Sequence, residues 1–133
     1  MRVLFDGDVL VDAILEKDKS AMAMVELVQS RSLKGAVVMS DIAYIYDKLL
    51  VKMSSEKARS EIDKILGFMH AIVPGLGDYV KSVYVDDDAD MRMNLYLSCA
   101  VRNRCDVILT NRRVGLTVGV RMMTPVMLAA ARV

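Results

Sequence analysis

Short apolar runs alternate with helix-periodic stretches along this chain of 133 residues. Apolar runs that end at a turn signal are typical of buried parallel strands. Such runs occupy residues 3–5, 36–40, 71–75 and 106–110, and a further short strand is expected near residue 122. Elsewhere apolar residues recur every three or four positions, which predicts helices. The predicted helices cover about residues 9–14, 20–29, 42–53, 55–69, 77–85 and 89–103, with a last one starting near Pro125.

Strands that alternate with helices indicate βαβ units and a mainly parallel sheet. We therefore expect one domain over residues 1–133, a three-layer α/β fold with a central sheet of four or five strands flanked by helices. The strand ends at Asp6, Ser40 and Thr110 should line one edge of this sheet. Ligands of open α/β sheets bind at that edge.

Three local features are also predicted. Asp8 is suited to cap the first helix, although it is equally suited to bind a ligand. His70 is placed at the end of an amphipathic helix, where a lone histidine is usually structural. Residues 111–120, which contain two glycines, are expected to form a loop.

Composition indicates a globular protein, because 54% of the residues are apolar and 26% are charged. No apolar stretch approaches the roughly 18 residues of a membrane-spanning helix. Asp6 and Asp8 interrupt the only apolar segment near the N-terminus, so it does not resemble a signal peptide. We expect a cytoplasmic protein without membrane contacts, in which Cys99 and Cys105 are buried free thiols.

The net charge of +1 hides an uneven distribution. Residues 91–133 carry seven arginines and a single acid, Asp106, whereas the first 90 residues carry an excess of acids. Arginine is suited to planar recognition of phosphate. A solvated basic face is an equally good explanation of this pattern.

Carboxylates supply the candidate chemistry. Asp6 closes a buried strand, where an acid is costly without a partner, so a function is favoured there. Asp90 belongs to the acid run over residues 86–90, which leads into the late helix and is also typical of a solvated helix start. Thr110 can act at the site or simply bond local backbone.

Together these features resemble a PIN domain over essentially the whole chain. The resemblance lies in the first strand ending in Asp6, the second ending in Ser40, the acidic approach to a late helix, and the strand ending in Thr110. Members of that family are mostly metal-dependent ribonucleases, and many are the toxin half of bacterial toxin–antitoxin pairs. The resemblance implies a carboxylate cluster that binds Mg²⁺ or Mn²⁺, hard cations that take oxygen ligands.

The site residues match this family in part. Asp6 matches its first aspartate, Asp90 matches the first acid of a pair before the late helix, and Thr110 matches the strand end. Asp8 stands where asparagine is usual, and Gly7 stands where a small hydroxyl residue is usual. Three other places that are acidic in the family carry a displaced acid or another residue type. These are Tyr46 or Asp47 after the second strand, Met93 with Arg92 on the late helix, and Arg112 or Asn111 after the fourth strand.

The resemblance therefore implies a metal site with fewer acids than usual. Its expected ligands are Asp6, Asp8 and Asp90, and Asp6, Asp90 and Thr110 are its expected catalytic residues. Asp88 is a further candidate assistant. Arg112 and Arg113 are expected to contact RNA phosphates or, alternatively, to pair with the acids and replace the charge of the metal.

Three functions are compatible with these residues. The first is a divalent-metal-dependent endoribonuclease of toxin–antitoxin type, acting on single-stranded or structured RNA and controlled by an antitoxin. The second is a catalytically inactive PIN-like module that binds RNA or protein, and in either case we expect a homo-oligomer such as a homodimer. The third is a haloacid-dehalogenase-like phosphatase, suggested by the segment VLFDGDVLVD. Only 23 residues follow Thr110, too few for the later motifs of that phosphatase family.

Overall fold

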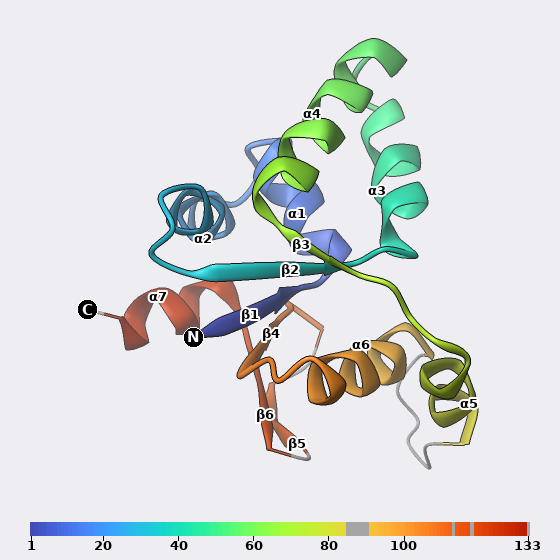
Figure 1. The fold of residues 1–133 in the computed structure, drawn as a ribbon. Coiled ribbons are helices and arrows are strands. Elements are labelled where there is room, and N and C mark those ends of the chain that lie inside the picture. The colour runs from blue at the N-terminus through green and yellow to red at the C-terminus, as the bar shows by residue number, and fades with distance from the viewer. Residues whose placement is uncertain (85–90, 113, 118, 133) are drawn as a thin grey trace.

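A six-stranded sheet forms the middle of the structure, a computed structural model that describes residues 1–84, 91–112, 114–117 and 119–132 (Figure 1). Its strands are β1 (Arg2–Phe5), β2 (Lys34–Val38), β3 (His70–Ile72), β4 (Val107–Leu109), β5 (Gly115–Thr117) and β6 (Val120–Met123). Their order across the sheet is β3-β2-β1-β4-β6-β5, and all neighbours are parallel except β5 and β6. Five strands therefore begin along one edge of the sheet and end along the other.

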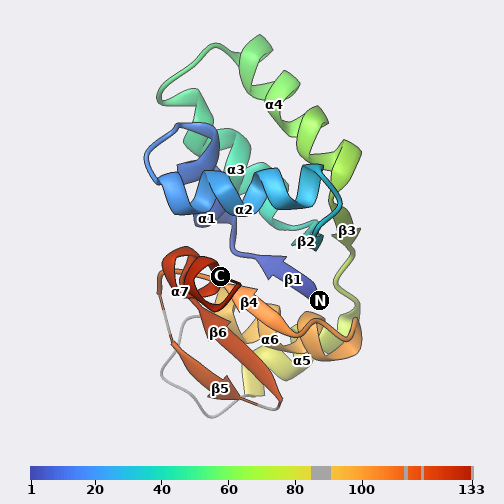
Figure 2. The same cartoon turned by 90° about the vertical axis from the view of Figure 1, so that its left-hand side faces the viewer.

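Helices cover both faces of this sheet (Figures 1 and 2). They are α1 (Gly7–Ile14), α2 (Lys19–Gln29), α3 (Asp41–Leu50), α4 (Ser55–Phe68), α5 (Leu76–Tyr84), α6 (Met91–Arg102) and α7 (Pro125–Ala131). Helices α1 to α4 lie on one side and α5 and α6 on the other. None of the helices in the described ranges is long and apolar enough to cross a membrane.

The core is divided in two by the sheet, because successive side chains of a strand point to opposite faces. Val3 and Phe5 of β1 pack with α1 to α4 and α7, whereas Leu4 packs with α6 on the other face. All three side chains are fully buried. Strands that are apolar at every position are therefore needed here, as the sequence pattern indicates. The predicted three-layer α/β fold is confirmed.

Three local predictions differ from the structure. The sheet has one strand more than the expected four or five, because Gly115–Thr117, within the predicted loop, pairs with β6 at the outer edge. Helix α1 begins two residues earlier than expected, and its cap is Asp6, whose side chain accepts from the Asp8 amide. His70 begins β3 instead of ending a helix, because Ala36 of β2 pairs with it.

An ion pair between the buried Asp78 and the half-exposed Arg102 joins α5 to α6. Asp78 of α5 accepts hydrogen bonds from the Arg102 guanidinium at 2.8 Å and from the Ser98 hydroxyl at 2.7 Å. It also accepts from the Gly75 amide at 2.8 Å. Burial alone would raise the pKa of Asp78, but these three donors outweigh it and lower the pKa to about 2.

This contact predicts a pH dependence of stability. Since the folded-state pKa of Asp78 lies below that of the unfolded chain, the folded state binds fewer protons as the pH falls toward about 2. The stabilisation is therefore present above about pH 4 and is lost below it. We expect the free energy of unfolding to fall less for Asp78→Asn than for the wild-type protein between about pH 4 and about pH 2. Urea denaturation at several pH values measures this free energy. Equal slopes would contradict this account.

Candidate functional site

The predicted edge of the sheet assembles a cluster around Asp6. Asp6 follows β1 and Thr110 follows β4, which are neighbouring parallel strands, so both side chains emerge at the same place. The Thr110 hydroxyl donates to Asp6 Oδ2 at 2.8 Å. We use the name Asp6 cluster for the residues joined around this carboxylate: Asp6, Asp8, Asp41, Tyr44, Arg92, Tyr96, Thr110 and Arg112.

The carboxylate of Asp6 is fully buried and surrounded by donors. Besides Thr110, Oδ2 accepts from Arg112 Nε at 3.1 Å. Oδ1 accepts from the Asp8 amide and from the Tyr96 hydroxyl, both at 3.1 Å, and Arg92 Nη2 lies 3.5 Å away. A buried carboxylate is tolerated when it is paired and hydrogen-bonded, and two guanidinium groups fulfil that condition here.

Arg92 of α6 connects three carboxylates. Its guanidinium lies 3.5 Å from Asp6, 3.7 Å from Asp8 and 3.7 Å from Asp41. The same group lies 4.0 Å from the centre of the Tyr44 ring, which is a cation–π distance. Arg92 Nε is buried and finds no acceptor among the described residues. One positive charge therefore sits at the centre of three acids.

Asp41 is a buried acid that the sequence analysis did not identify as part of the site. It is the first residue of α3, and it accepts from the Gly7 amide at 3.2 Å and from the Tyr96 hydroxyl. Tyr96 also reaches Asp6, but one hydroxyl proton serves only one carboxylate at a time. Burial raises the pKa of Asp41, which favours a proton on that carboxyl.

Tyr44 supplies the contact from α3. Its hydroxyl donates to Asp8 Oδ1 at 2.5 Å, and burial together with this acid raises the pKa of the phenol. The sequence pointed to Tyr46 or Asp47 for this place, but Asp47 is exposed and Tyr46 packs against the core. Tyr44 therefore occupies the place on α3 from which a side chain reaches the cluster.

The structure brings together four of the residues singled out from the sequence, namely Asp6, Asp8, Thr110 and Arg112. Three other residues predicted for the site, Asp88, Asp90 and Arg113, lie outside the residues that the structure describes. Arg92 and Tyr96 are four residues apart on α6, so they share a helix face, and this spacing was the available sign that both reach the site.

The cluster does not fit a divalent cation as the described side chains are arranged. No three acids, histidines or cysteines within the described ranges are placed to share a metal ion. Both oxygens of Asp6 already accept from several donors, and two of these donors carry a positive charge. A cation between Asp6 and Asp8 would also meet the charge of Arg92.

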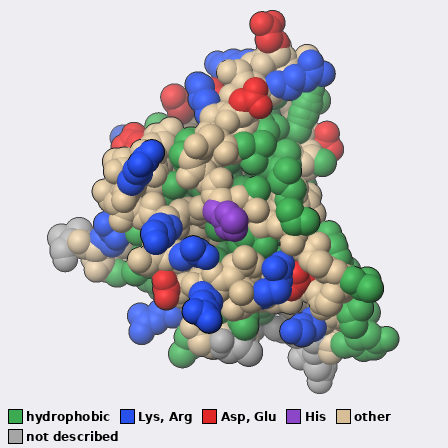
Figure 3. Space-filling view, in the orientation of Figure 1, with side chains coloured by type: hydrophobic (Ala, Val, Ile, Leu, Met, Phe, Trp, Pro, Cys, Tyr) green, Lys and Arg blue, Asp and Glu red, His purple; other side chains and the backbone are tan. Residues whose placement is uncertain are grey.

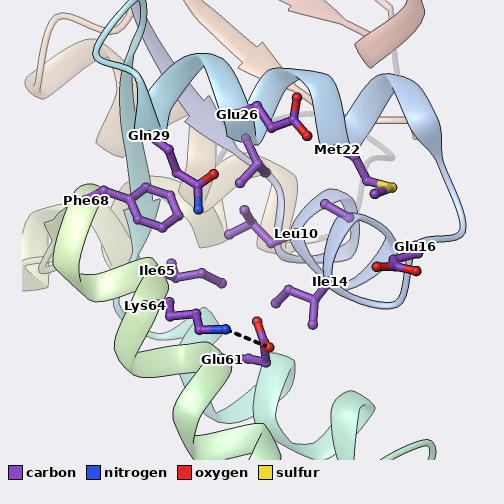
Figure 4. Close-up of a pocket in the computed structure, with 12 residues that line it drawn as sticks. Leu10, Ile14, Glu16, Met22, Glu26, Gln29, Glu61, Lys64, Ile65 and Phe68 are labelled. Atoms are coloured by element: carbon purple, nitrogen blue, oxygen red, sulfur yellow. Dashed lines mark hydrogen bonds and ion pairs between the residues drawn. The ribbon is translucent and has the colours of Figure 1, made fainter.

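A separate groove lies among α1, α2 and α4 (Figure 4). It has a volume of about 220 Å³, and its floor carries apolar side chains such as Leu10, Ile65 and Phe68. Glu16 and Glu26 stand at its border, together with Glu61, whose carboxylate lies 3.3 Å from Lys64. No member of the Asp6 cluster lines this groove, so it is a second candidate binding surface.

Comparison with solved structures shows the fold of this chain in other proteins. A chain of VapBC2 from Rickettsia felis, crystallised with a DNA fragment from the VapBC2 promoter, is 16% identical with a TM-score of 0.64. The match covers 84% of this chain and 88% of that one. A chain of a toxin–antitoxin complex from Klebsiella pneumoniae is 15% identical with a TM-score of 0.68, covering 92% of this chain and 97% of that one.

Sequence comparison gives the family. No curated protein matches this sequence. The family profile described as "PIN domain" matches residues 2–113, which include β1 through β4 and every member of the Asp6 cluster. The chain therefore belongs to the PIN domain family.

Proposed function

We propose that this PIN domain, extending over residues 1–133, is a binding module of toxin–antitoxin type whose Asp6 cluster is closed by arginines and does not act through a divalent metal. The observation that carries this proposal is the pairing of Asp6 with both Arg92 and Arg112. A metal ion normally supplies the positive charge in a carboxylate site of this kind. Here two guanidinium groups supply it from within the chain.

The positions of these arginines support the same conclusion. In the family resemblance, Arg112 stands where an Asp or Asn is common and Arg92 stands beside the second acid of the late helix. Each replacement removes a prospective oxygen ligand and adds a positive charge in direct reach of Asp6. Thr110 and Tyr96 then act as positioning residues that satisfy the Asp6 carboxylate.

An antitoxin-like protein is the partner that we propose for this module. The R. felis and K. pneumoniae structures are both toxin–antitoxin assemblies. The groove among α1, α2 and α4 combines an apolar floor with glutamates at its border. These features suit an amphipathic helix with basic flanks.

Self-association and RNA binding remain part of this proposal. Helix α5 carries exposed apolar side chains at Leu76, Val80, Val83 and Tyr84. Their spacing of four, three and one residues places them along one stripe of the helix, which a second copy would cover. Arg112 is committed to Asp6, so RNA contacts near this cluster would have to come from other groups or from rearrangement of this pair.

The test is a calorimetric titration of Mn²⁺ into the wild-type protein and into Asp6→Asn. We expect no saturable binding at the Asp6 cluster up to about 1 mM Mn²⁺, because Arg92 and Arg112 oppose a second cation there. Any weak binding that is equal in both proteins lies outside the cluster and agrees with the proposal.

The nuclease function is the alternative outcome of the same titration. Saturable binding in the wild-type protein that disappears in Asp6→Asn would overturn the proposal. It would mean that Asp6, with Asp8 and Asp90, holds Mg²⁺ or Mn²⁺, and that a search for an RNA substrate is justified. Circular dichroism of both proteins would exclude loss of the fold as the cause.

A further inference from the structure

The edge of the sheet opposite the Asp6 cluster carries a row of basic residues. Lys34 begins β2 and lies beside Arg2 of β1 in the strand register. Arg121 lies in β6, and Arg31 and Arg104 stand in the turns that lead into β2 and β4. We use the name basic edge for the four exposed members of this row, Arg31, Lys34, Arg104 and Arg121.

The register fixes the length of this row. The strands β2, β1, β4 and β6 are consecutive in the sheet, and neighbouring strands lie roughly 4.8 Å apart. The basic edge therefore extends over about 14 Å, the distance along a duplex axis occupied by about four phosphates of one strand. In Figure 3, blue side chains gather over the starts of β1 and β2 and the turn after α6.

The described acids leave the four charges of the basic edge without ion pairs. Among the described residues, none of its four members forms an ion pair with an acid. Asp106 is the acid of this edge, and its carboxylate accepts from the Arg2 amide at 2.8 Å. The Arg2 guanidinium itself donates to the Asn103 carbonyl at 2.9 Å. The four exposed cations thus remain available to a partner.

The backbone at two of these positions gives a second, independent observation. Arg31 and Arg104 have φ values of 63° and 55°, in the left-handed region where glycine is the unstrained residue. Each follows the end of a helix, the usual place for such a glycine. Among the described residues, Glu16, with φ of 57°, is the other non-glycine residue in the left-handed region. A favourable interaction with the helix dipole is the alternative reason for a basic side chain there.

We propose that the basic edge binds the phosphate backbone of a nucleic acid, without reading its bases. Arginine donates to phosphate oxygens in a planar, bidentate manner. The neighbouring Ser30 hydroxyl already donates to the Leu27 carbonyl and is hydrogen-bonded to Ser32, so the arginines and the lysine supply the donors. An anionic membrane would instead favour large aromatic anchors, which these turns lack. The inference does not depend on whether the Asp6 cluster binds a metal.

The test uses the double variant Arg31→Gly/Arg104→Gly of the full chain. Binding to a fluorescent 20-base-pair DNA duplex and to a single-stranded 20-nucleotide RNA is measured by anisotropy at several salt concentrations. We expect the variant to bind at least about tenfold more weakly than the wild-type protein, with a salt slope reduced by about two. Its melting temperature should not fall by more than about 2 °C, because glycine removes the backbone strain.

The matched control is Lys52→Gln/Lys57→Gln, which removes two exposed charges at the connection between α3 and α4. Its affinity should remain within about twofold of the wild-type value. Preferred binding to the duplex or to the RNA identifies which nucleic acid the edge takes. The proposal is overturned if the wild-type protein binds neither, if both double variants lose affinity equally, or if phosphatidylserine vesicles bind while both nucleic acids do not.

Discussion

The double variant Arg92→Asp/Arg112→Asp is expected to bind Mn²⁺ about two orders of magnitude more tightly than the wild-type protein, since ligand charge tunes the affinity of carboxylate sites over several decades. Both arginines lie within 3.5 Å of the Asp6 carboxylate. Replacing them removes two opposing charges and adds two oxygen ligands beside Asp6 and Asp8. Calorimetry should therefore show saturable binding by the variant at Mn²⁺ concentrations where the wild-type protein shows none.

Thermal unfolding gives a second measurement of the same variant. Without metal, the two introduced carboxylates would repel Asp6, Asp8 and Asp41 at this place, so the melting temperature should fall. Added Mn²⁺ should raise it again, because a ligand that binds only the folded state stabilises that state. The matched control, Arg59→Asp/Arg132→Asp, reverses two exposed charges elsewhere. Its melting temperature should neither fall in this way without metal nor rise when Mn²⁺ is added. A variant that stays folded and gains no affinity would contradict the assignment of the two arginines.

The single variant Arg92→Met is expected to lower the free energy of unfolding by about 2–3 kcal/mol. Removing one partner of a buried ion pair typically costs about 3–5 kcal/mol, because the remaining charge stays buried. Arg92 is 32% exposed, so solvent screening reduces that figure. Asp6 and Asp41 are the acids that would lose their common cation. Urea denaturation monitored by circular dichroism measures the change.

Two further variants separate charge from packing at this position. Arg92→Lys keeps the charge but loses the planar contact with the Tyr44 ring, so it should cost less than Arg92→Met. Arg59→Met removes an exposed arginine of α4 and should change stability by no more than about 0.5 kcal/mol. If Arg92→Met lowered the free energy of unfolding no more than Arg59→Met does, Arg92 would not stabilise the three carboxylates.

The sequence was sufficient to predict the layers of the fold and the edge of the sheet at which the Asp6 cluster assembles. Buried parallel strands are apolar throughout, so their ends are visible as the first polar residues, Asp6 and Thr110. Because β1 and β4 are adjacent, these two residues meet at 2.8 Å. The edge strand β5 was missed because a three-residue strand that begins with glycine carries no alternating pattern.

The partners of Asp6 were harder to predict. Asp41 follows Ser40 directly and resembles an ordinary first-turn acid that favours the helix dipole. Its burial depends on the distance between α3 and α1, which no local pattern encodes. Tyr96 resembles a core aromatic, and only its hydroxyl connects it to Asp6. Two roles were considered for Arg112, namely contact with RNA or pairing with the acids. In the structure Arg112 pairs with an acid, Asp6.

Gly7 and Asp41 are coupled positions. A Cβ atom at position 7 would lie 2.9 Å from Asp41 Oδ2 and 3.4 Å from Ile45. The small hydroxyl residue that is usual in the family at position 7 would therefore force the Asp41 carboxylate to shift. That shift would also move the acceptor of the backbone amide at position 7. The effects of substitutions at these two positions are therefore expected to be non-additive.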